Sequence, residues 1–266
     1  MYIPEGTLEL YQDATGWKDF SYLIDVAYVP DFTVDGVTYT QLGKESVGVI
    51  LIEPVSIDGN GRWTSELVLP ATIEHEGITY RLTEICSTGL SGSSWLRSIV
   101  IPDGVVAIRS YAFRNCRSLR KVTIPKDITN IDYGTFEWCP IDTMIVKSMT
   151  PPRVWDDRAL GDNYMYNGVL IIPTGSLESY MNAQDWQDFY KIEEESGYSN
   201  VFEVDGVHYK MYSVEDTEVA VIGASASEII IPDSVMYDKK YAVTTIADEA
   251  FGGNQELESI IISEGV

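Results

Sequence analysis

One stretch of sequence decides the fold of this chain: Val106-Ala107-Ile108-Arg109-Ser110-Tyr111-Ala112-Phe113-Arg114-Asn115-Cys116, then Leu119, Val122, Ile124 and Pro125. The same residue types return 23 residues later, as Ile131, Phe136 and Cys139. The Leu-x-x-Val-x-Ile part alternates between inward and outward positions, which is typical of a short strand with one buried face. The proline that follows cannot donate to a ladder of hydrogen bonds, so the predicted strand ends before Pro125.

Two further copies of this pattern fix the fold class. Upstream, the same offsets hold Ile85, Leu90, Leu96, Ile99, Ile101 and Pro102. Near the end they hold Ile246, Ala250, Phe251, Leu257, Ile260 and Ile262. Such a unit cannot bury its apolar face alone, and stacking the units makes one continuous core. Because a period of about 20–29 residues is that of leucine-rich repeats, we expect an α+β, β-rich leucine-rich-repeat solenoid with short strands and short helical or 3-10 turns.

A second, longer period indicates modules. Residues 169 positions apart repeat each other, namely Ile3, Pro4, Gly6, Leu8, Tyr11, Ala14, Trp17 and Phe20 as Ile172, Pro173, Gly175, Leu177, Tyr180, Ala183, Trp186 and Phe189. We therefore expect residues 1–30 to be the tail, or capping segment, of a preceding module. Residues 31–195 then form a complete leucine-rich-repeat module, and residues 196–266 the truncated start of a following one. On this interpretation the chain is a piece of a longer polypeptide.

Each module is expected to begin with a β-hairpin and to end with a helix. Phe32-Thr33-Val34-Asp35-Gly36-Val37-Thr38-Tyr39 places Asp-Gly between alternating β-formers, and the pattern recurs at 202–209. Further strands are predicted at 47–52, 66–69, 79–85 and 168–172. Ser176 is a candidate N-cap for a helix to about Tyr190, which would cover the last coil with Trp186 and Phe189. A ligand platform is the alternative interpretation of these aromatic residues.

The composition excludes some classes of partner. The chain has 18 Lys and Arg against 41 Asp and Glu, a formal net charge of −23. Such a field repels phosphate, so we expect neither nucleic-acid binding nor docking on an anionic membrane. No window holds the roughly 18 uninterrupted apolar residues of a membrane helix, so no membrane insertion of this segment is expected. The N-terminal residues do not read as a secretory signal.

The three cysteines bear on the stacking of the repeats. Cys116 and Cys139 lie one repeat apart, so they should stack on neighbouring coils about 5 Å apart, near the Cα separation of a disulfide. Stacked cysteines also serve as small buried hydrophobic residues. We favour a reduced ladder and keep the disulfide as the alternative.

Residues that carry chemistry are few. His75 lies between Glu74 and Glu76 and His208 lies in the second hairpin; a solvated loop is favoured over a metal site for His75. Asp58-Gly59-Asn60-Gly61, with Asp156-Asp157 and Asp162-Asn163, offers oxygen ligands for calcium, but turn chemistry explains these residues as well. The sequence Gly89-Leu90-Ser91-Gly92-Ser93 fails the nucleophile-elbow pattern at its last position. We expect no catalytic residues, no cofactor and no bound metal.

The repeat Ile108-x4-Phe113-x2-Cys116-x2-Leu119-x2-Val122-x-Ile124-Pro125 resembles the BspA-like leucine-rich-repeat family of bacterial surface proteins. The resemblance implies secretion or surface display, binding to host or bacterial proteins, and no catalytic residues. The chain departs from the family pattern at Leu90, where Phe is usual, and at Ser93 and Asn254, where Cys is usual. The third repeat is also shortened near Pro140.

The predicted function is binding. Outward strand positions should line one sheet face as a protein-contact face, which we define as Arg97, Ser98, Val100, Arg120, Lys121 and Thr123. Arg97, Arg120 and Lys121 concentrate positive charge within an acidic protein. We expect a non-catalytic, extracellular or cell-surface protein that mediates protein–protein binding or adhesion. The alternatives are a passive spacer that presents another domain, and a solenoid that binds or acts on a polysaccharide.

Overall fold

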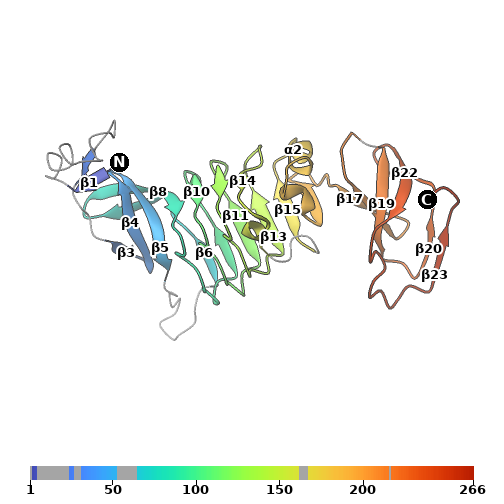
Figure 1. Cartoon of the computed structure of the whole chain (residues 1–266), viewed down its shortest axis with the longest axis horizontal. Helices are drawn as coiled ribbons and strands as arrows, with labels where there is room; N and C mark the ends of the chain where they lie inside the picture. The colour runs from blue at the N-terminus through green and yellow to red at the C-terminus, as the bar shows by residue number, and fades with distance from the viewer. Residues whose placement is uncertain (1, 5–23, 27–30, 53–64, 162–166, 216) are drawn as a thin grey trace. The chain divides into compact units, whose positions relative to one another are not determined.

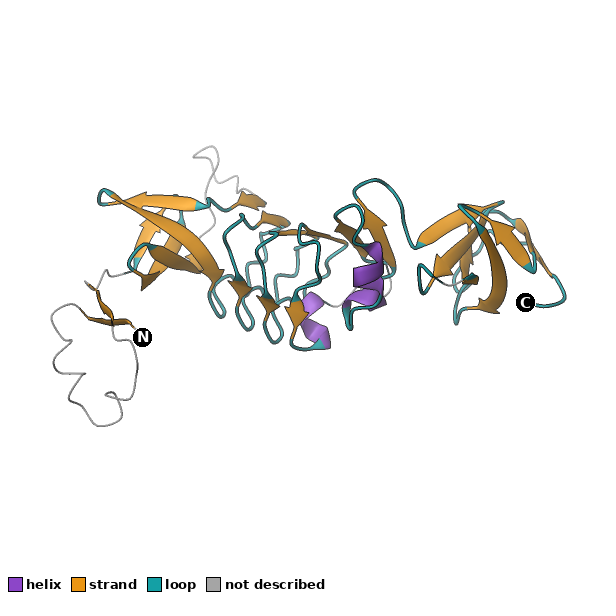
Figure 2. Cartoon of the chain, turned by 90° about the horizontal axis from the view of Figure 1, so that it is seen from above, coloured by secondary structure: helices purple, strands orange, loops and turns teal. Residues whose placement is uncertain are grey.

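The computed structural model describes residues 2–4, 24–26, 31–52, 65–161, 167–215 and 217–266 (Figure 1). The chain forms two compact units, Met1–Ile141 with Pro152–Asn163 and Asp142–Pro151 with Tyr164–Val266, which we take in turn. Both units are β-rich, and the described residues contain one α-helix and two 3-10 turns (Figure 2). The expectation of a β-rich, leucine-rich-repeat type of fold with little helix is confirmed.

The first unit consists almost entirely of short strands. They are β1 (Tyr2–Pro4), β2 (Ile24–Val26), β3 (Phe32–Val34), β4 (Val37–Gly43), β5 (Ser46–Ile52), β6 (Glu66–Val68), β7 (Thr72–His75), β8 (Ile78–Ile85), β9 (Ser98–Val100), β10 (Ala107–Ile108), β11 (Lys121–Ile124), β12 (Asn130–Ile131) and β14 (Arg153–Val154), with the 3-10 turn η1 (Asp157–Leu160).

The main sheet of the first unit starts with the predicted hairpin. β3 and β4 are antiparallel with Phe32 opposite Tyr39, and the turn residues Asp35 and Gly36 have positive φ (50° and 78°). β4 pairs with β5 in antiparallel fashion, β5 runs parallel to β8, and β7 forms a hairpin with β8. The predicted strands at 47–52, 66–69 and 79–85 are confirmed to within a residue.

Beyond β8 the strands stack by the repeat period. Ala107 of β10 lies opposite Glu84 of β8 on one side and Asn130 of β12 on the other, and both pairings join residues 23 positions apart. β12 is followed by β14 in the same parallel order. In a second parallel ladder, β6–β9–β11, the β9–β11 pair uses the same step, because Ser98 lies opposite Lys121, whereas Glu66 of β6 lies opposite Ser98 at a separation of 32 residues. Each repeat therefore contributes one strand to each of two ladders.

The apolar repeat positions form the core between these ladders. The side chains at these positions are fully buried, at 0% exposure: Ile99, Ile101, Ile108, Cys116, Leu119, Val122, Ile124, Ile131 and Cys139. Phe113 and Phe136, one repeat apart, are equally buried and stack with their ring centroids 5.0 Å apart. Full burial of one such side chain contributes about 1.5–3 kcal/mol, so the repeated pattern accounts for most of the stabilisation.

Two left-handed residues turn the chain in each repeat. Thr88, Tyr111 and Gly134 occupy one repeat position, with φ of 59°, 59° and 57°. Gly92, Asn115 and Trp138 occupy a second position, with φ of 78°, 63° and 62°. Positive φ is unusual for Tyr and Trp, so the stacked neighbours must hold the turns. The ring of Tyr111 explains one glycine, because a Cβ at Gly134 would lie 2.6 Å from it.

The second unit contains the remaining elements. They are β13 (Thr143–Val146), β15 (Val169–Ile172), α2 (Leu177–Met181), η2 (Trp186–Asp188), β16 (Lys191–Glu194), β17 (Val201–Val204), β18 (Val207–Met211), β19 (Glu218–Ala224), β20 (Glu228–Ile231), β21 (Ser234–Met236), β22 (Lys240–Ile246) and β23 (Ser259–Ile262). β13, β15 and β16 form a parallel ladder, which confirms the strand predicted at 168–172. β17–β18–β19–β22–β21 form a mixed sheet, and β20 pairs in parallel with β23.

The helix predicted over residues 176–190 is wrong in length. α2 ends at Met181, and Asp185, with φ of 68°, redirects the chain into η2. Ser176 stands at the N-cap position, but its hydroxyl donates to the Pro173 carbonyl oxygen at 2.6 Å and does not cap the helix. A carboxylate oxygen of Glu194 instead accepts the backbone N–H groups of Gly175 (2.8 Å) and Leu177 (3.1 Å). The break lets Trp186 and Phe189 both reach the interior, at 1% exposure each.

The two units repeat each other's strand registers. Phe202 lies opposite Tyr209 as Phe32 lies opposite Tyr39, and in both hairpins a bulge of the next strand pair falls just before that tyrosine. Of the residues compared across the longer period, Trp17 and Phe20 lie outside the described part of the chain, as do the candidate calcium residues 58–61, Asp162 and Asn163.

Candidate protein-contact surfaces

The basic residues of the contact face lie next to one another on successive coils of the first unit. Arg97 precedes β9 and Arg120 precedes β11, and all three cationic side chains, Arg97, Arg120 and Lys121, are exposed. The backbone N–H groups of Arg120 and Lys121 both donate to the Arg97 carbonyl oxygen, at 2.8 and 3.2 Å. The fold thus places Arg97 on one rung and the neighbouring Arg120 and Lys121, 23 and 24 residues later in the sequence, on the next.

The rest of the contact face is less open than the alternation of strand residues suggests. Ser98 and Val100 are half-buried, and Thr123 is only 7% exposed. Thr123 lies between the buried Val122 and Ile124 of β11 and is itself buried, so the burial of this strand does not alternate. The exposed part of the predicted contact face is therefore the basic group at the strand starts, and Thr123 is corrected to a nearly buried position.

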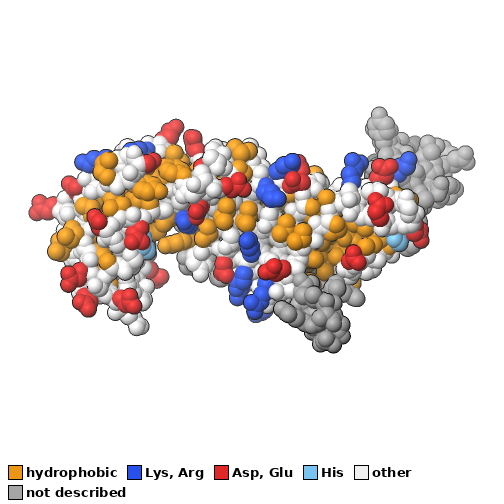
Figure 3. All heavy atoms as spheres, turned by 180° about the vertical axis from the view of Figure 1, so that it is seen from behind, with side chains coloured by type: hydrophobic (Ala, Val, Ile, Leu, Met, Phe, Trp, Pro, Cys, Tyr) orange, Lys and Arg blue, Asp and Glu red, His pale blue; other side chains and the backbone are white. Residues whose placement is uncertain are grey.

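Each cation of this basic group has a different environment. A guanidinium N–H of Arg120 donates to the Pro140 carbonyl oxygen at 2.9 Å, which orients that side chain. Within the described residues, no ion pair joins Arg97 or Lys121 to an acidic side chain. One face of the molecule carries several Lys and Arg side chains beside exposed hydrophobic ones (Figure 3). Arg97 and Lys121 therefore offer exposed positive charge to an acidic partner surface.

A second surface, which sequence reasoning missed, gathers aromatic residues on the loops between the strands of the first unit. Tyr133, Trp138 and Trp155 are exposed by 45%, 46% and 53%. The Tyr111 and Tyr133 rings meet edge to face with centroids 5.4 Å apart. The signal for this surface was present in the repeat alignment, because Tyr111 and Trp138 occupy the two left-handed turn positions.

Arginines lie against these rings and organise them. The Arg114 guanidinium lies 5.2 Å from the Tyr111 ring centroid and 4.4 Å from that of Trp138. The same guanidinium is 2.8 Å from the Glu137 carboxylate, to which Arg158 donates at 3.2 Å. Cation–π contacts contribute about 0.5–2 kcal/mol each, so the aromatic surface is held in one arrangement. We call Tyr111, Arg114, Tyr133, Glu137 and Trp138 the aromatic cluster.

The histidines are engaged in structural contacts. His75 stacks on Phe32 with ring centroids 4.0 Å apart, and Tyr237 stacks on Phe202 in the same way in the second unit, at 4.3 Å. His208 Nε2 lies 3.0 Å from the Glu203 carboxylate, across the hairpin. In the described part of the chain, no group of three or more His, Cys, Asp and Glu side chains is close enough to hold a metal ion.

Cys86, Cys116 and Cys139 form no disulfide, and the thiols of Cys116 and Cys139 bond the backbone of the preceding coil. The Cys116 thiol donates to the Leu90 carbonyl oxygen at 3.1 Å, and Cys139 donates to that of Phe113 at 2.9 Å. A hydrogen bond with the Cys139 thiol lowers the pKa of Cys116, against the effect of burial. Where the repeat has Asn254, its amide donates to the Ala224 carbonyl oxygen at 3.2 Å. The position therefore requires a small side chain that can donate a hydrogen bond.

Parallel ladders with a 23-residue step, and a core of Leu, Ile, Val and Phe at fixed repeat positions, define a leucine-rich-repeat protein. The family model described as the BspA type leucine rich repeat region (6 copies) matches residues 78–151. This part of the chain is a BspA-type leucine-rich-repeat region, as the sequence resemblance implied. No curated protein matches the chain.

The chain is similar to solved bacterial leucine-rich-repeat structures. One from Bacteroides ovatus is 18% identical with a TM-score of 0.39, over 87% of this chain and 41% of that one. One from Bacteroides capillosus is 17% identical with a TM-score of 0.42, over 53% of this chain and 97% of that one. A leucine rich cell surface protein from Faecalibacterium prausnitzii is 16% identical with a TM-score of 0.34, over 88% of this chain and 77% of that one.

The chain spans 41% of the length of the B. ovatus protein. None of the helices described in this chain is both long and apolar enough to cross a membrane.

Proposed function

We propose that this chain is a non-catalytic part of a secreted or surface-displayed bacterial protein, and that it binds a partner protein through Arg97, Arg120 and Lys121. The observation that carries the proposal is the placement of these three exposed cations on adjacent rungs in a chain of net charge −23. Complementary charges on two proteins speed their encounter and fix their relative orientation. The partner therefore presents an acidic surface to these cations.

The proposed framework for this face is a solenoid assembled from modules of residues 1–30, 31–195 and 196–266, with α2 and η2 covering the last coil of the complete module. Support comes from matched strand pairs at the longer period. Ile3 lies opposite Asp25 in β1–β2, as Ile172 lies opposite Glu194 in β15–β16. A regular array of coils suits the presentation of a binding surface to a partner protein, because each coil adds one more strand to the same sheet face.

The test is charge reversal with a matched control. The triple variant Arg97→Glu, Arg120→Glu, Lys121→Glu and a control triple at exposed cations elsewhere, Lys44→Glu, Lys126→Glu, Lys240→Glu, change the net charge equally. Binding of both to a panel of purified extracellular-matrix and plasma proteins is measured by interferometry at low and physiological salt. The first triple should lose binding and its salt dependence, and the control should keep them. Equal effects of the two triples would contradict the proposal.

A second candidate function is polysaccharide binding at the aromatic cluster and at Trp155, favoured by the exposed rings of Tyr133, Trp138 and Trp155. Trp138→Ala and Trp155→Ala should then abolish retention on insoluble polysaccharides without affecting the protein panel. A passive spacer is the remaining alternative. It predicts that neither set of substitutions changes any binding.

A further inference from the structure

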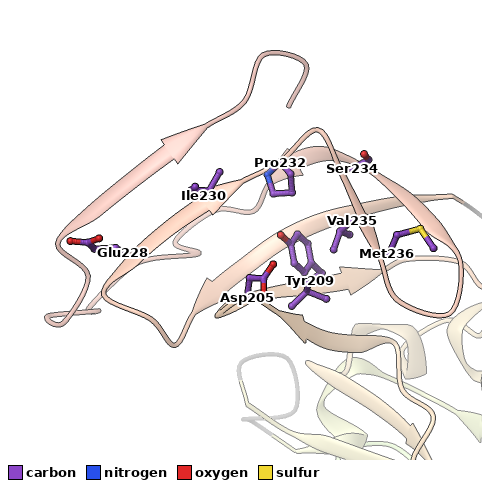
Figure 4. Close-up of a pocket in the computed structure, with 9 residues that line it drawn as sticks. Asp205, Tyr209, Glu228, Ile230, Pro232, Ser234, Val235 and Met236 are labelled. Carbon is purple, nitrogen blue, oxygen red and sulfur yellow. The ribbon is translucent and has the colours of Figure 1, made fainter.

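A groove in the second unit lies beside the edge strand β20. Its volume is about 660 Å³, and its walls come from β20, from the β17–β18 turn and from β21 (Figure 4). The side chains that line it include Asp205, Tyr209, Glu228, Ile230, Val235 and Met236. The turn closes one side of the groove, because the Ser225 backbone N–H donates to the Gly206 carbonyl oxygen at 2.9 Å just before β20.

The backbone of β20 is half-paired. In its parallel ladder with β23, the carbonyl oxygens of Ser227 and Ile231 accept from the N–H groups of Ser259 and Ser263, both at 2.9–3.1 Å. Alternate residues of a parallel strand bond to the same neighbour, so the N–H and C=O groups of Ile230 point to the opposite edge. Among the residues that the structure describes, no strand pairs with that edge. An open edge of this kind is a template for another strand.

The walls combine exposed apolar side chains with unpaired carboxylates. Ile230 is 61% exposed and Met236 is 64% exposed, although both are large hydrophobic residues. Val235 and Tyr209 beneath them are buried, at 5% and 1% exposure. Asp205 and Glu228 are exposed, and no Lys or Arg of the described residues forms an ion pair with either. The groove is therefore apolar along the edge strand and negative at its walls.

The first unit carries similar residue types at several of these places, although Glu74 stands where Met236 stands, and this partial match is an independent observation. The acids Asp35 and Glu66 stand where Asp205 and Glu228 stand, and Val68, 71% exposed, stands where Ile230 stands. Its backbone direction is also the same. The Leu69 N–H donates to the Val100 carbonyl oxygen and the Ser98 N–H to that of Ser65, at 3.1 and 3.0 Å, so the backbone of Val68 faces away from β9. Val68 on β6 and Ile230 on β20 are both exposed β-branched residues with an Asp and a Glu at matching positions. This recurrence argues against an accidental exposure of Ile230.

We propose that the groove beside β20 binds an extended peptide segment of alternating apolar and basic residues, which adds as a strand to the open edge. The peptide backbone pairs with the N–H and C=O groups of Ile230, its apolar side chains pack on Ile230 and Met236, and a Lys or Arg side chain lies against Asp205 and Glu228. Strand addition takes affinity from main-chain hydrogen bonds and specificity from alternate side chains.

This occupant follows from the chemistry of the walls. Charge complementarity requires a cationic partner, because Asp205 and Glu228 carry no cation of this chain. The polar groups along the groove are those of a strand edge, which match another backbone. The aromatic ring that lines it, Tyr209, is 1% exposed and offers no platform for a sugar. The groove lies apart from Arg97, Arg120 and Lys121 in the sequence and takes the opposite charge, so its test is independent of the proposed function.

The experiment uses the full 266-residue chain and fluorescence anisotropy with a labelled, terminally blocked peptide of alternating valine and lysine. A valine–glutamate peptide tests charge, and a version of the valine–lysine peptide N-methylated at alternate residues tests backbone pairing. We expect only the unmodified valine–lysine peptide to bind. Hydrogen exchange at the Ile230 amide should slow when it does.

Substitutions test the groove residues one function at a time. Ile230→Pro removes the outward N–H and leaves the β20–β23 ladder intact, because that N–H takes no part in it, and should abolish binding. Ile230→Thr keeps the N–H and should weaken binding less. Asp205→Asn with Glu228→Gln should weaken it by roughly tenfold, as expected for the loss of two exposed ion pairs. Asn suits position 205, where φ is 50°.

Three results would overturn the proposal: no binding of the valine–lysine peptide, equal binding of the N-methylated peptide, or unchanged affinity in Ile230→Pro with a native thermal unfolding curve. Concentration-dependent dimerisation that Ile230→Pro abolishes would assign the edge to a second copy of the chain instead. If a variant loses binding because it unfolds, the hydrogen exchange of the Ile230 amide in the unsubstituted chain decides instead. Exchange that the peptide does not slow would overturn the proposal.

Discussion

Residues 106–125 and 244–263 are two copies of one repeat that bury the same positions to very different extents. Val122 and Ile124 are fully buried, whereas the corresponding Ile260 and Ile262 are 39% and 52% exposed. Phe113 stacks on Phe136 of the following coil, whereas Phe251 is only half-buried. The comparison teaches that a repeat residue stabilises the fold through its stacked neighbour, so equal sequence does not mean equal energy.

The largest effect expected from this comparison is at the phenylalanine. Phe113→Ala should lower the free energy of unfolding by about 3–5 kcal/mol, because it leaves a cavity beside Phe136. Phe251→Ala should lower it by about 1 kcal/mol or less, since Phe251 is only half-buried. Urea unfolding followed by circular dichroism measures both. Similar losses in the two variants would show that the neighbour is not what matters.

A smaller loss of stability is expected when the buried carboxylate that binds the N-terminus of α2 is removed. Glu194, 7% exposed, accepts two backbone N–H groups, and Glu194→Ala leaves both donors unsatisfied. We expect a loss of about 1–3 kcal/mol of unfolding free energy. The control is Glu193→Ala on the same strand, whose carboxylate is half-exposed and pairs with Lys191. Thermal unfolding curves of the two variants should differ, and coincident curves would argue against this role of Glu194.

The donor position of the repeat gives the next comparison. Cys116→Ala removes a buried thiol and its hydrogen bond to the Leu90 carbonyl oxygen, at an expected loss of about 1–2 kcal/mol. Asn254→Ala removes the same kind of bond from a half-buried site, at an expected loss of about 1 kcal/mol or less. Cys116→Ser keeps a donor and should recover part of the loss. If serine were as destabilising as alanine, the hydrogen bond would be irrelevant.

The smallest effect on stability is expected at the basic residues of the contact face. Arg97→Glu, Arg120→Glu and Lys121→Glu change exposed side chains, so each should change the unfolding free energy by no more than about 0.5 kcal/mol. Differential scanning calorimetry of the triple variant gives the sum. A large loss would mean that these cations stabilise the coils, and would remove the reason to assign them to a partner.

The sequence predicted the parts of the fold that depend on periodicity. The 23-residue period placed Phe113 and Phe136 in one core, and the Asp-Gly hairpins emerged with the expected register. These predictions succeed because apolar alternation and turn chemistry are local and repeated. The helix over 176–190 failed because Asp185, with φ of 68°, redirects the chain into η2, and this break lets Trp186 and Phe189 both be buried.

The surfaces were harder to predict because they depend on what lies beside each side chain. The alternation pattern predicts an outward, exposed Thr123, but Thr123 is buried like Val122 and Ile124 on either side of it. Two residues of the aromatic cluster, Tyr111 and Trp138, stand at left-handed turn positions, where Tyr and Trp are not expected. The groove beside β20 is lined by Asp205, Ile230 and Met236, which come from separate elements of the fold. No spacing in the sequence predicts that these residues lie together.

The 23-residue step of the ladders has a consequence for motion. Each rung bonds only to adjacent rungs, so one coil can open without the opening of the whole array. Local unfolding should therefore spread from one rung to the next. Amide protection is then expected to fall in steps from the interior rungs to β23, whose side chains are all exposed. A chain built in this way confines an opening event to the rung in which it starts and to the rungs bonded to it.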